Sequence, residues 1–298
     1  MRSLNLLAAA PAPPGGAIGV GEGLGAVQIA GTLHALAPGE RAHPYRVLHA
    51  REAWALVLAG APAVRTPAGA AQLRPGDVTC FPAGPAGAHE LSGPGLVLLL
   101  EDARASAVAE LPEEGLVTLG DGRWLRVTAA ESAPPAREAP AGAPRDVVNV
   151  LEVPVEAAQD VPPPGFRCRS ARLAPFLGSS ALGATVYELD PGEAICPYHW
   201  EGADEEWLIV LAGTPTLRDP AGEHLLRPWD AAGFPTGPDG AHAVRNGGSE
   251  VARVLMLSTR PAPDVSVCVY PDSAKVGVWP GGGQFRFADD VGYWYGEA

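Results

Sequence analysis

A histidine and several carboxylates lie directly before an apolar run in the segment PYHWEGADEEWLIVLAG, from Pro197 to Gly213. Imidazole nitrogens and carboxylate oxygens are ligands that suit a divalent transition metal. His199 and Glu201 stand two residues apart, and residues at this spacing on a strand point to the same face. The segment therefore predicts either a metal site or an acidic loop on the surface of a β-sandwich.

The chain contains an internal repeat with an offset of 153 residues. Residues 36–89 align without a gap with residues 189–242, and 29 of the 54 aligned positions are identical. A repeat of this length indicates two homologous domains rather than a solenoid of small units. A chain of 298 residues can supply each domain with a core of its own.

Each copy is predicted to consist of short strands between turns. AWALVLAG (53–60) and EWLIVLAG (206–213) have the composition of buried strands, and Pro-Ala-Gly forms a hairpin turn in both copies. The 37 glycines and 32 prolines favour short strands over long helices, because proline removes a backbone donor and clashes with the preceding helical turn. We predict an all-β fold with an antiparallel barrel or jelly roll in each copy.

The order of motifs in the second copy resembles that of the cupin family. The first cupin motif, G(X)5HXH(X)3–4E(X)6G, is matched by Gly192, His199, Glu206 and Gly213, with His199 one residue late and Glu201 in place of the second histidine. The second motif, G(X)5PXG(X)2H(X)3N, is matched by Pro235, Gly237, His242 and Asn246, with two residues inserted before the histidine and Trp229 in place of the first glycine. With two copies, the chain resembles a bicupin, which implies two tandem jelly-roll β-barrels.

The resemblance implies a metal inside the barrel, held by three histidines and one glutamate. Carried over to the second copy, it implies the ligands His199, Glu201, Glu206 and His242. Two histidines and two glutamates form a harder and more anionic site, which favours iron, manganese or zinc, with nickel left open. The glutamate at position 201 is also consistent with a degraded site, so a pocket without metal stays an alternative, although metal binding is favoured.

The first copy serves as a control for these ligands. Three of the four positions change type there, to Arg46, Leu48 and Ala53, and only His242 keeps its type, as His89. We therefore expect the first barrel to lack this metal and to act as a structural or dimerising half. We interpret His89 as a turn or core histidine and Arg46 as a surface residue or a charge for an anionic ligand.

Other residues near the motifs receive mainly structural interpretations. Glu205 matches Glu52 in the first copy, so we expect a structural or surface carboxylate there, with Glu206 as the ligand because neighbours on a strand face opposite ways. We expect Cys196 to be a packed thiol rather than a soft ligand. Trp54 and Trp207 hold the same place in both copies and are predicted to be structural, while His43 and His49 flank the first copy's altered site.

The predicted boundaries are 1–130 for the first barrel, 131–165 for a linker region and 166–298 for the second barrel. The linker contains the Pro/Ala-rich stretch 131–146. The C-terminal tail lies outside the repeat, and we expect its aromatic residues to pack on a barrel or on a partner subunit: Trp279, Phe285, Phe287, Tyr293, Trp294 and Tyr295.

The composition of the chain limits the kinds of partner that the protein is expected to bind. The formal net charge of −13 and the lack of a basic segment argue against nucleic acid. No apolar run reaches the ~20 residues that span a membrane. The four cysteines form no CxxC pair and are expected to be reduced. We expect a cytoplasmic protein that binds a small molecule, and a homodimer is consistent with the fold.

Two functions remain open on the sequence alone. The first is a metal-binding bicupin that acts on a small polar or anionic molecule through its C-terminal barrel, as a dioxygenase, a decarboxylase or an isomerase. In that case the metal would be a Lewis acid or an oxygen-activating centre. The second is a non-catalytic bicupin of the ligand-binding or storage type, without an essential metal. No nucleophile with an oriented base and no phosphate-binding loop is evident.

Overall fold

The computed structural model describes residues 3–11, 15–120, 122–127, 147–158, 162–260, 265–279 and 281–287. Strands dominate this part of the chain, and the α-helices α1 (Gly21–Leu24) and α2 (Ala174–Leu177) are one turn long. The all-β prediction is confirmed. Stretch 131–146 and the aromatic residues of 293–295 lie outside the described residues. No helix within these ranges has the length and apolar character needed to cross a membrane.

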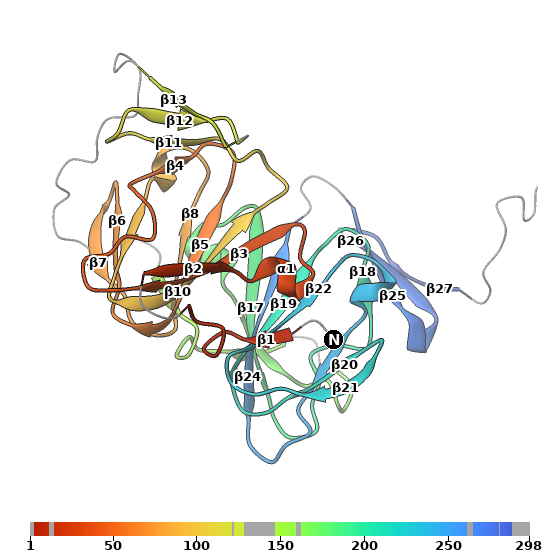
Figure 1. Cartoon of the computed structure of the whole chain (residues 1–298). Helices are drawn as coiled ribbons and strands as arrows, with labels where there is room; N and C mark the ends of the chain where they lie inside the picture. The colour runs from red at the N-terminus through yellow and green to blue at the C-terminus, as the bar shows by residue number, and fades with distance from the viewer. Residues whose placement is uncertain are drawn as a thin grey trace, which may run out of the picture.

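Two large antiparallel sheets repeat the same strand order, one in each barrel. The first is β14 (Val147–Asn149), β8 (Asp77–Phe81), β5 (Ala53–Gly60), β10 (Gly95–Asp102), β3 (Ile29–Leu36) and β2 (Gly16–Gly19). The second is β1 (Ser3–Asn5), β22 (Asp230–Phe234), β19 (Glu206–Ala212), β24 (Ala252–Thr259), β17 (Leu182–Leu189), β16 (Arg169–Arg172) and β15 (Glu156–Ala157). The two barrels lie beside each other in Figure 1, the first mainly orange and the second mainly green to blue.

Smaller sheets complete the barrels. Hairpins with the expected Pro-Ala-Gly turn join β6 (Ala63–Thr66) to β7 (Gly69–Gln72) and β20 (Thr216–Asp219) to β21 (Gly222–Leu225), and the third strands are β9 (Glu90–Ser92) and β23 (Ala243–Arg245). One four-stranded sheet orders β13 (Trp124–Arg126), β12 (Leu116–Thr118), β11 (Ala109–Leu111) and β4 (Val47–Leu48). The other orders β18 (Trp200–Glu201), β25 (Ser266–Tyr270), β26 (Lys275–Trp279) and β27 (Gln284–Arg286), so the described part of the tail extends the second barrel and leaves Trp279, Phe285 and Phe287 exposed.

Each large sheet ends in a strand from outside its own repeat. We call residues 3–11 and 147–155 the crossed arms. Residues 3–11 pair through β1 with β22 of the second barrel, whereas residues 147–155 pair through β14 with β8 of the first barrel. The amide of Asn5 donates to Asp230 at 2.8 Å, and the amide of Asn149 donates to Asp77 at 2.9 Å. The second arm therefore lies within the segment 131–165 that was expected to be a linker, yet it is part of the first barrel's sheet.

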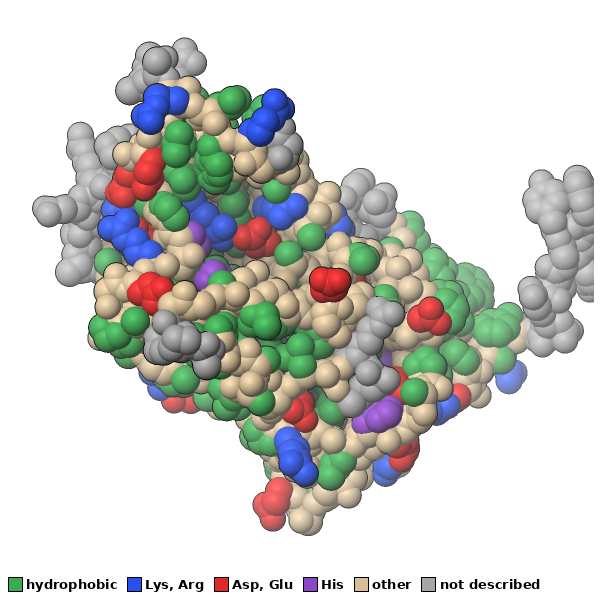
Figure 2. All heavy atoms as spheres, viewed as in Figure 1, with side chains coloured by type: hydrophobic (Ala, Val, Ile, Leu, Met, Phe, Trp, Pro, Cys, Tyr) green, Lys and Arg blue, Asp and Glu red, His purple; other side chains and the backbone are tan. Residues whose placement is uncertain are grey.

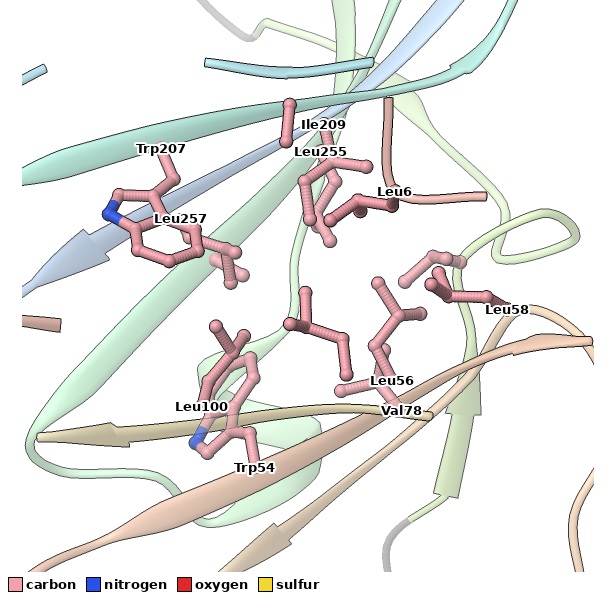
Figure 3. Packing of buried hydrophobic residues seen from close by; sticks show 14 of the residues in the cluster. Leu6, Trp54, Leu56, Leu58, Val78, Leu100, Trp207, Ile209, Leu255 and Leu257 are labelled. Atoms are coloured by element: carbon pink, nitrogen blue, oxygen red, sulfur yellow. The ribbon is translucent and has the colours of Figure 1, made fainter. Parts of the chain in front are cut away.

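A hydrophobic core lies between the two large sheets. Along β5 the side chains alternate, with Trp54 and Leu56 in this shared core and Ala55 and Val57 inside the first barrel. The same alternation along β19 places Trp207 in the shared core. Figure 3 shows Trp54 and Trp207 on opposite sheets of it. Both tryptophans are about fully buried, at 1% and 0% exposure, which agrees with the structural role predicted for them.

Two buried carboxylates join the barrels reciprocally. Glu205 accepts hydrogen bonds from the backbone N–H groups of residues 27, 28 and 29, at 2.6, 2.9 and 2.9 Å. Glu52 accepts from those of residues 180, 181 and 182, at 2.7, 3.2 and 3.0 Å. These donors are themselves offset by 153 residues, so the two contacts are related by the repeat. Glu205 is thus structural, and the surface alternative for it is wrong.

Candidate metal centre

A short backbone bridge brings the two site histidines together. His199, directly before β18, exchanges backbone hydrogen bonds of 3.1 and 2.8 Å with His242, which follows the 3-10 turn Pro238–Gly240. Their ring centroids are 4.6 Å apart. Glu206 begins β19, and the alternation along that strand turns its side chain into the barrel, on the face of Leu208 and Val210.

Three of the four predicted ligands form one compact group. The ligand atoms of His199, Glu206 and His242 lie within 4.8 Å of one another. Oε2 of Glu206 is 3.4 Å from Nε2 of His242 and 3.9 Å from Nε2 of His199. One ion could contact all three atoms after small side-chain movements, since transition metals sit about 2 Å from such ligands.

The backbone fixes which nitrogen each imidazole offers. Nδ1 of His199 donates to the carbonyl of Pro197 at 3.0 Å, and Nδ1 of His242 donates to that of Gly240 at 2.9 Å. This leaves the lone pair on Nε2, on the side of Glu206, as in metal sites whose histidines are oriented by a second hydrogen bond. Burial lowers the pKa of His199 and lowers that of His242 to about 3, so both rings are neutral near pH 7.

Glu206 lacks the partner that its surroundings require. Its Oε2 is buried and has no hydrogen-bond partner among the described residues. Burial, reinforced by the charges of Glu201 and Asp204, raises the pKa of Glu206 to about 8. An unpartnered carboxylate oxygen that faces two imidazole lone pairs is short of positive charge. The residues present therefore fit a divalent metal.

Glu201 lies beside this group rather than in it. Its Oε1 is 3.8 Å from Nε2 of His199, and its Oε2 accepts a hydrogen bond of 3.1 Å from Ser266. With His199 and Cys268 it forms a second group of ligand atoms within 4.8 Å. The side chain is 18% exposed, so it does not turn to solvent. The histidine common to both groups would let Glu201 serve as a fourth ligand or as a neighbour of the metal.

The tail supplies site residues that sequence reasoning missed. Cys268 and Tyr270 lie on one face of β25, whose pairing with β18 places Cys268 opposite Glu201. The ring of Tyr270 stacks on His199 at 5.7 Å. These residues follow the repeat, so no counterpart in the first copy drew attention to them, although the i, i+2 spacing of Cys268 and Tyr270 in the stretch SVCVY is that of one face of a strand. Sγ of Cys196 is 3.5 Å from Nδ1 of His199, the ring nitrogen that donates to the carbonyl of Pro197, as expected of a packed thiol rather than a ligand.

The first barrel keeps the histidine of this site but not its neighbours. His89 stacks on Phe81 as His242 stacks on Phe234, with centroids 3.8 and 3.7 Å apart. Arg46, the counterpart of His199, donates from Nε to Nε2 of His89 at 3.3 Å. A guanidinium therefore stands where a cation would need to bind. His49 instead pairs with Glu110 at 3.1 Å, and its side chain is 37% exposed.

Comparison with known proteins agrees with this architecture. A family model described as a cupin domain matches residues 185–258. A cupin 2 conserved barrel domain protein from Leptotrichia buccalis covers 87% of this chain and 96% of its own at 12% identity and a TM-score of 0.53. The fold is that of a two-barrel cupin. Oxalate decarboxylase from Bacillus subtilis, in a study of its Mn(II) centres, resembles this protein over 90% of the chain and 79% of its own, at 17% identity and a TM-score of 0.52.

A shorter structure resembles part of this chain. A cupin-superfamily sugar phosphate isomerase from Silicibacter pomeroyi covers 46% of the chain and 89% of its own, at 24% identity and a TM-score of 0.41. A search of curated protein sequences found no match. The family match includes His199, Glu206 and His242, so the cupin motifs of the second copy lie in the domain where the residues fit a metal.

Proposed function

We propose that the second barrel of this cupin binds one divalent transition metal and is a metal-dependent oxidoreductase for a small polar or anionic substrate. The observation that carries the proposal is the group His199, Glu206 and His242, two imidazoles and one carboxylate whose ligand atoms lie within 4.8 Å of one another. A set of two histidines and one carboxylate would leave coordination positions open on a bound ion and is typical of non-haem iron(II) oxygenases. Any such ion would supply a Lewis-acidic centre, and iron or manganese would also supply a redox-active one, which zinc would not.

The protein's own residues prepare the site. The carbonyls of residues 197 and 240 hold the imidazoles with Nε2 inward, and the stacked ring of Phe234 keeps His242 from turning. A rigid ligand set keeps the open positions in a constant place relative to the barrel wall. The substrate would enter beside Glu201 and Tyr270, which lie next to His199.

A proton is held beside the site. Oγ of Ser266 lies 3.1 Å from Glu201 and 2.9 Å from Asp204, and a hydroxyl has only one hydrogen to donate. Both contacts are hydrogen bonds only when one of the two carboxyls is protonated. Burial raises the pKa of both carboxyls, which favours this state. The pair could deliver a proton to a substrate bound next to Glu201.

The direct test is the metal content of protein purified without an affinity-metal step. We expect about one equivalent of iron, manganese, zinc or nickel in the parent and its loss in His199→Ala/His242→Ala. His224→Ala is the matched control, because His224 lies in the same barrel and pairs with Asp219 instead of facing the site. If neither parent nor reconstituted protein holds metal, the proposal is wrong and the non-catalytic ligand-binding alternative takes its place.

A second measurement separates an oxidoreductase from a site that merely binds metal. Protein reconstituted with iron(II) without oxygen should bind nitric oxide and give the S = 3/2 signal of an iron–nitrosyl in electron paramagnetic resonance. The signal requires an open coordination position. Its absence in iron-loaded protein would leave a closed, structural metal site and would exclude the proposed reaction class.

A further inference from the structure

The first barrel contains a polar cavity that the metal proposal does not use. Its volume is about 250 Å³, and its lining includes Thr32 and His34 from β3, Leu99 and Glu101 from β10, and His43 and Arg46 from the loop that connects β3 to β4. The same face of the repeat forms the metal centre in the second barrel. In Figure 2, histidine, basic and acidic side chains gather in a hollow of the first barrel.

The charges in this cavity favour a single negative charge. Nη2 of Arg46 contacts Glu101 at 2.8 Å, and Nη1 of Arg51 contacts the same carboxylate at 3.4 Å. One carboxylate thus faces two guanidinium groups, which leaves one positive charge uncompensated. Burial and the charge of Arg46 lower the pKa of His34, and the same causes lower that of His43 to about 3, so neither ring adds charge near pH 7.

Two groups that face the cavity have hydrogen-bonding capacity left. Arg46 uses Nε on His89 and Nη2 on Glu101, which leaves both N–H groups of Nη1 without a partner among the described residues. His43 donates from Nδ1 to the carbonyl of Pro44 at 2.8 Å, so its Nε2 carries a lone pair. This Nε2 is buried and has no partner in the described part of the chain. A ligand must therefore offer an acceptor to Arg46 and a donor to His43.

We propose that the first barrel binds a small monoanionic hydroxy acid. Its carboxylate accepts hydrogen bonds from Arg46, and its hydroxyl donates to Nε2 of His43. The cavity has the volume of about eight water molecules in the liquid, which suits a ligand of three or four carbons. The barrel that lost three metal ligands is on this account a binding site of its own, independent of the metal in the second barrel.

Calorimetric titration of the metal-loaded full chain tests the proposal with glycolate, lactate and glycerate, and with propionate as the analogue of lactate that lacks the hydroxyl. We expect at least one hydroxy acid to bind, and lactate to bind at least tenfold more tightly than propionate. Arg46→Met should weaken binding at least tenfold. His199→Ala/His242→Ala should leave it unchanged, which separates this site from any binding at the metal.

Two further variants keep the test valid if Arg46→Met does not fold. Ala30→Leu fills the cavity without altering a charge and should abolish binding, because Ala30 lines it. His43→Phe should remove the preference for lactate over propionate. Arg74→Met is the control, since Arg74 is exposed and pairs with Glu152 away from the cavity. The proposal is overturned if none of the three hydroxy acids binds, or if binding survives Ala30→Leu but is lost in His199→Ala/His242→Ala.

Discussion

Glu205 and Glu206 are chemically identical neighbours that experience opposite environments. Glu205 faces the shared core between the barrels, where three backbone N–H groups solvate its carboxylate. Glu206 faces the barrel interior, where its Oε2 has no donor among the described residues. The difference follows from the alternation of side chains at the start of β19. One carboxylate is stabilised as an anion by the fold, whereas the other depends on a bound cation.

Metal affinity should therefore depend on pH. The pKa of Glu206 is raised to about 8, so below pH 8 the ligand is protonated before metal binds and must release a proton. We expect the logarithm of the association constant to rise by about one per pH unit between pH 6 and 8 and to level off above. Titration calorimetry in buffers of different ionisation enthalpy measures the released proton. No proton release at pH 6.5 would contradict the assignment of Glu206.

The two glutamates near His199 should differ in their effect on metal binding. Glu206→Gln removes an anionic oxygen from the compact group, and we expect loss of stoichiometric metal. Glu201→Gln alters a neighbour that is also held by Ser266, and we expect affinity to fall only about 10- to 100-fold. Elemental analysis after dialysis, with Glu223→Gln at an exposed position of the same barrel as control, distinguishes them. Equal losses of metal in the two variants would indicate that Glu201 is a metal ligand as Glu206 is.

At the scale of elements, the reciprocal carboxylates hold the ends of β3 and β17 against the opposite barrel. Glu52→Gln or Glu205→Gln keeps the shape of the side chain but replaces one accepting oxygen with an amide. We expect each substitution to lower the free energy of unfolding by about 3 kcal/mol, because buried donors lose a charged acceptor. Urea denaturation measures this, with exposed Glu22→Gln as control. A loss below about 1 kcal/mol in both variants would mean that water replaces these contacts.

Each crossed arm should stabilise the barrel whose sheet it extends, rather than the barrel that follows it in the sequence. Deleting residues 2–8 removes β1 and the fully buried Leu6, and we expect faster amide exchange mainly in β22. Val150→Ala, in the second arm, should instead speed exchange mainly in β8. Hydrogen exchange by mass spectrometry resolves the two strands. Faster exchange in β8 after the first deletion would contradict the exchange of arms.

The strands themselves were easier to predict from the sequence than the pairing between them. The repeat, the hairpins at Pro-Ala-Gly and the turn of Glu206 into the barrel follow from local composition and from the two-residue period. The crossed arms could not be predicted, because residues 3–11 and 147–155 lie outside the aligned repeat and their pairing is set by distant strands. Cys268 and Tyr270 were missed for the same reason. Trp229 keeps the left-handed backbone (φ 67°) of its counterpart Gly76 (φ 88°), which a glycine pattern alone did not anticipate.

For the molecule as a whole, the shared core predicts one cooperative unit. Both large sheets contribute side chains to it, so we expect the barrels to unfold in a single calorimetric transition. Metal bound in the second barrel should then protect β5 and β10 of the first barrel as well, by about 2.7 kcal/mol at a free concentration of 100 Kd. Hydrogen exchange with and without metal measures the protection. Two transitions, or protection confined to the second barrel, would show that the barrels unfold separately.

The crossed arms also set an order of events during protein synthesis. Asn5 is 225 residues away from its partner Asp230, so the ribosome makes β1 long before the strand beside which it belongs. The first barrel, in turn, emerges without β14 and exposes the edge of β8 until residues 147–149 follow. Neither barrel can finish folding on its own as it leaves the ribosome. The strand β1 is thus translated early but must stay unpaired until residues 230–234 have been made.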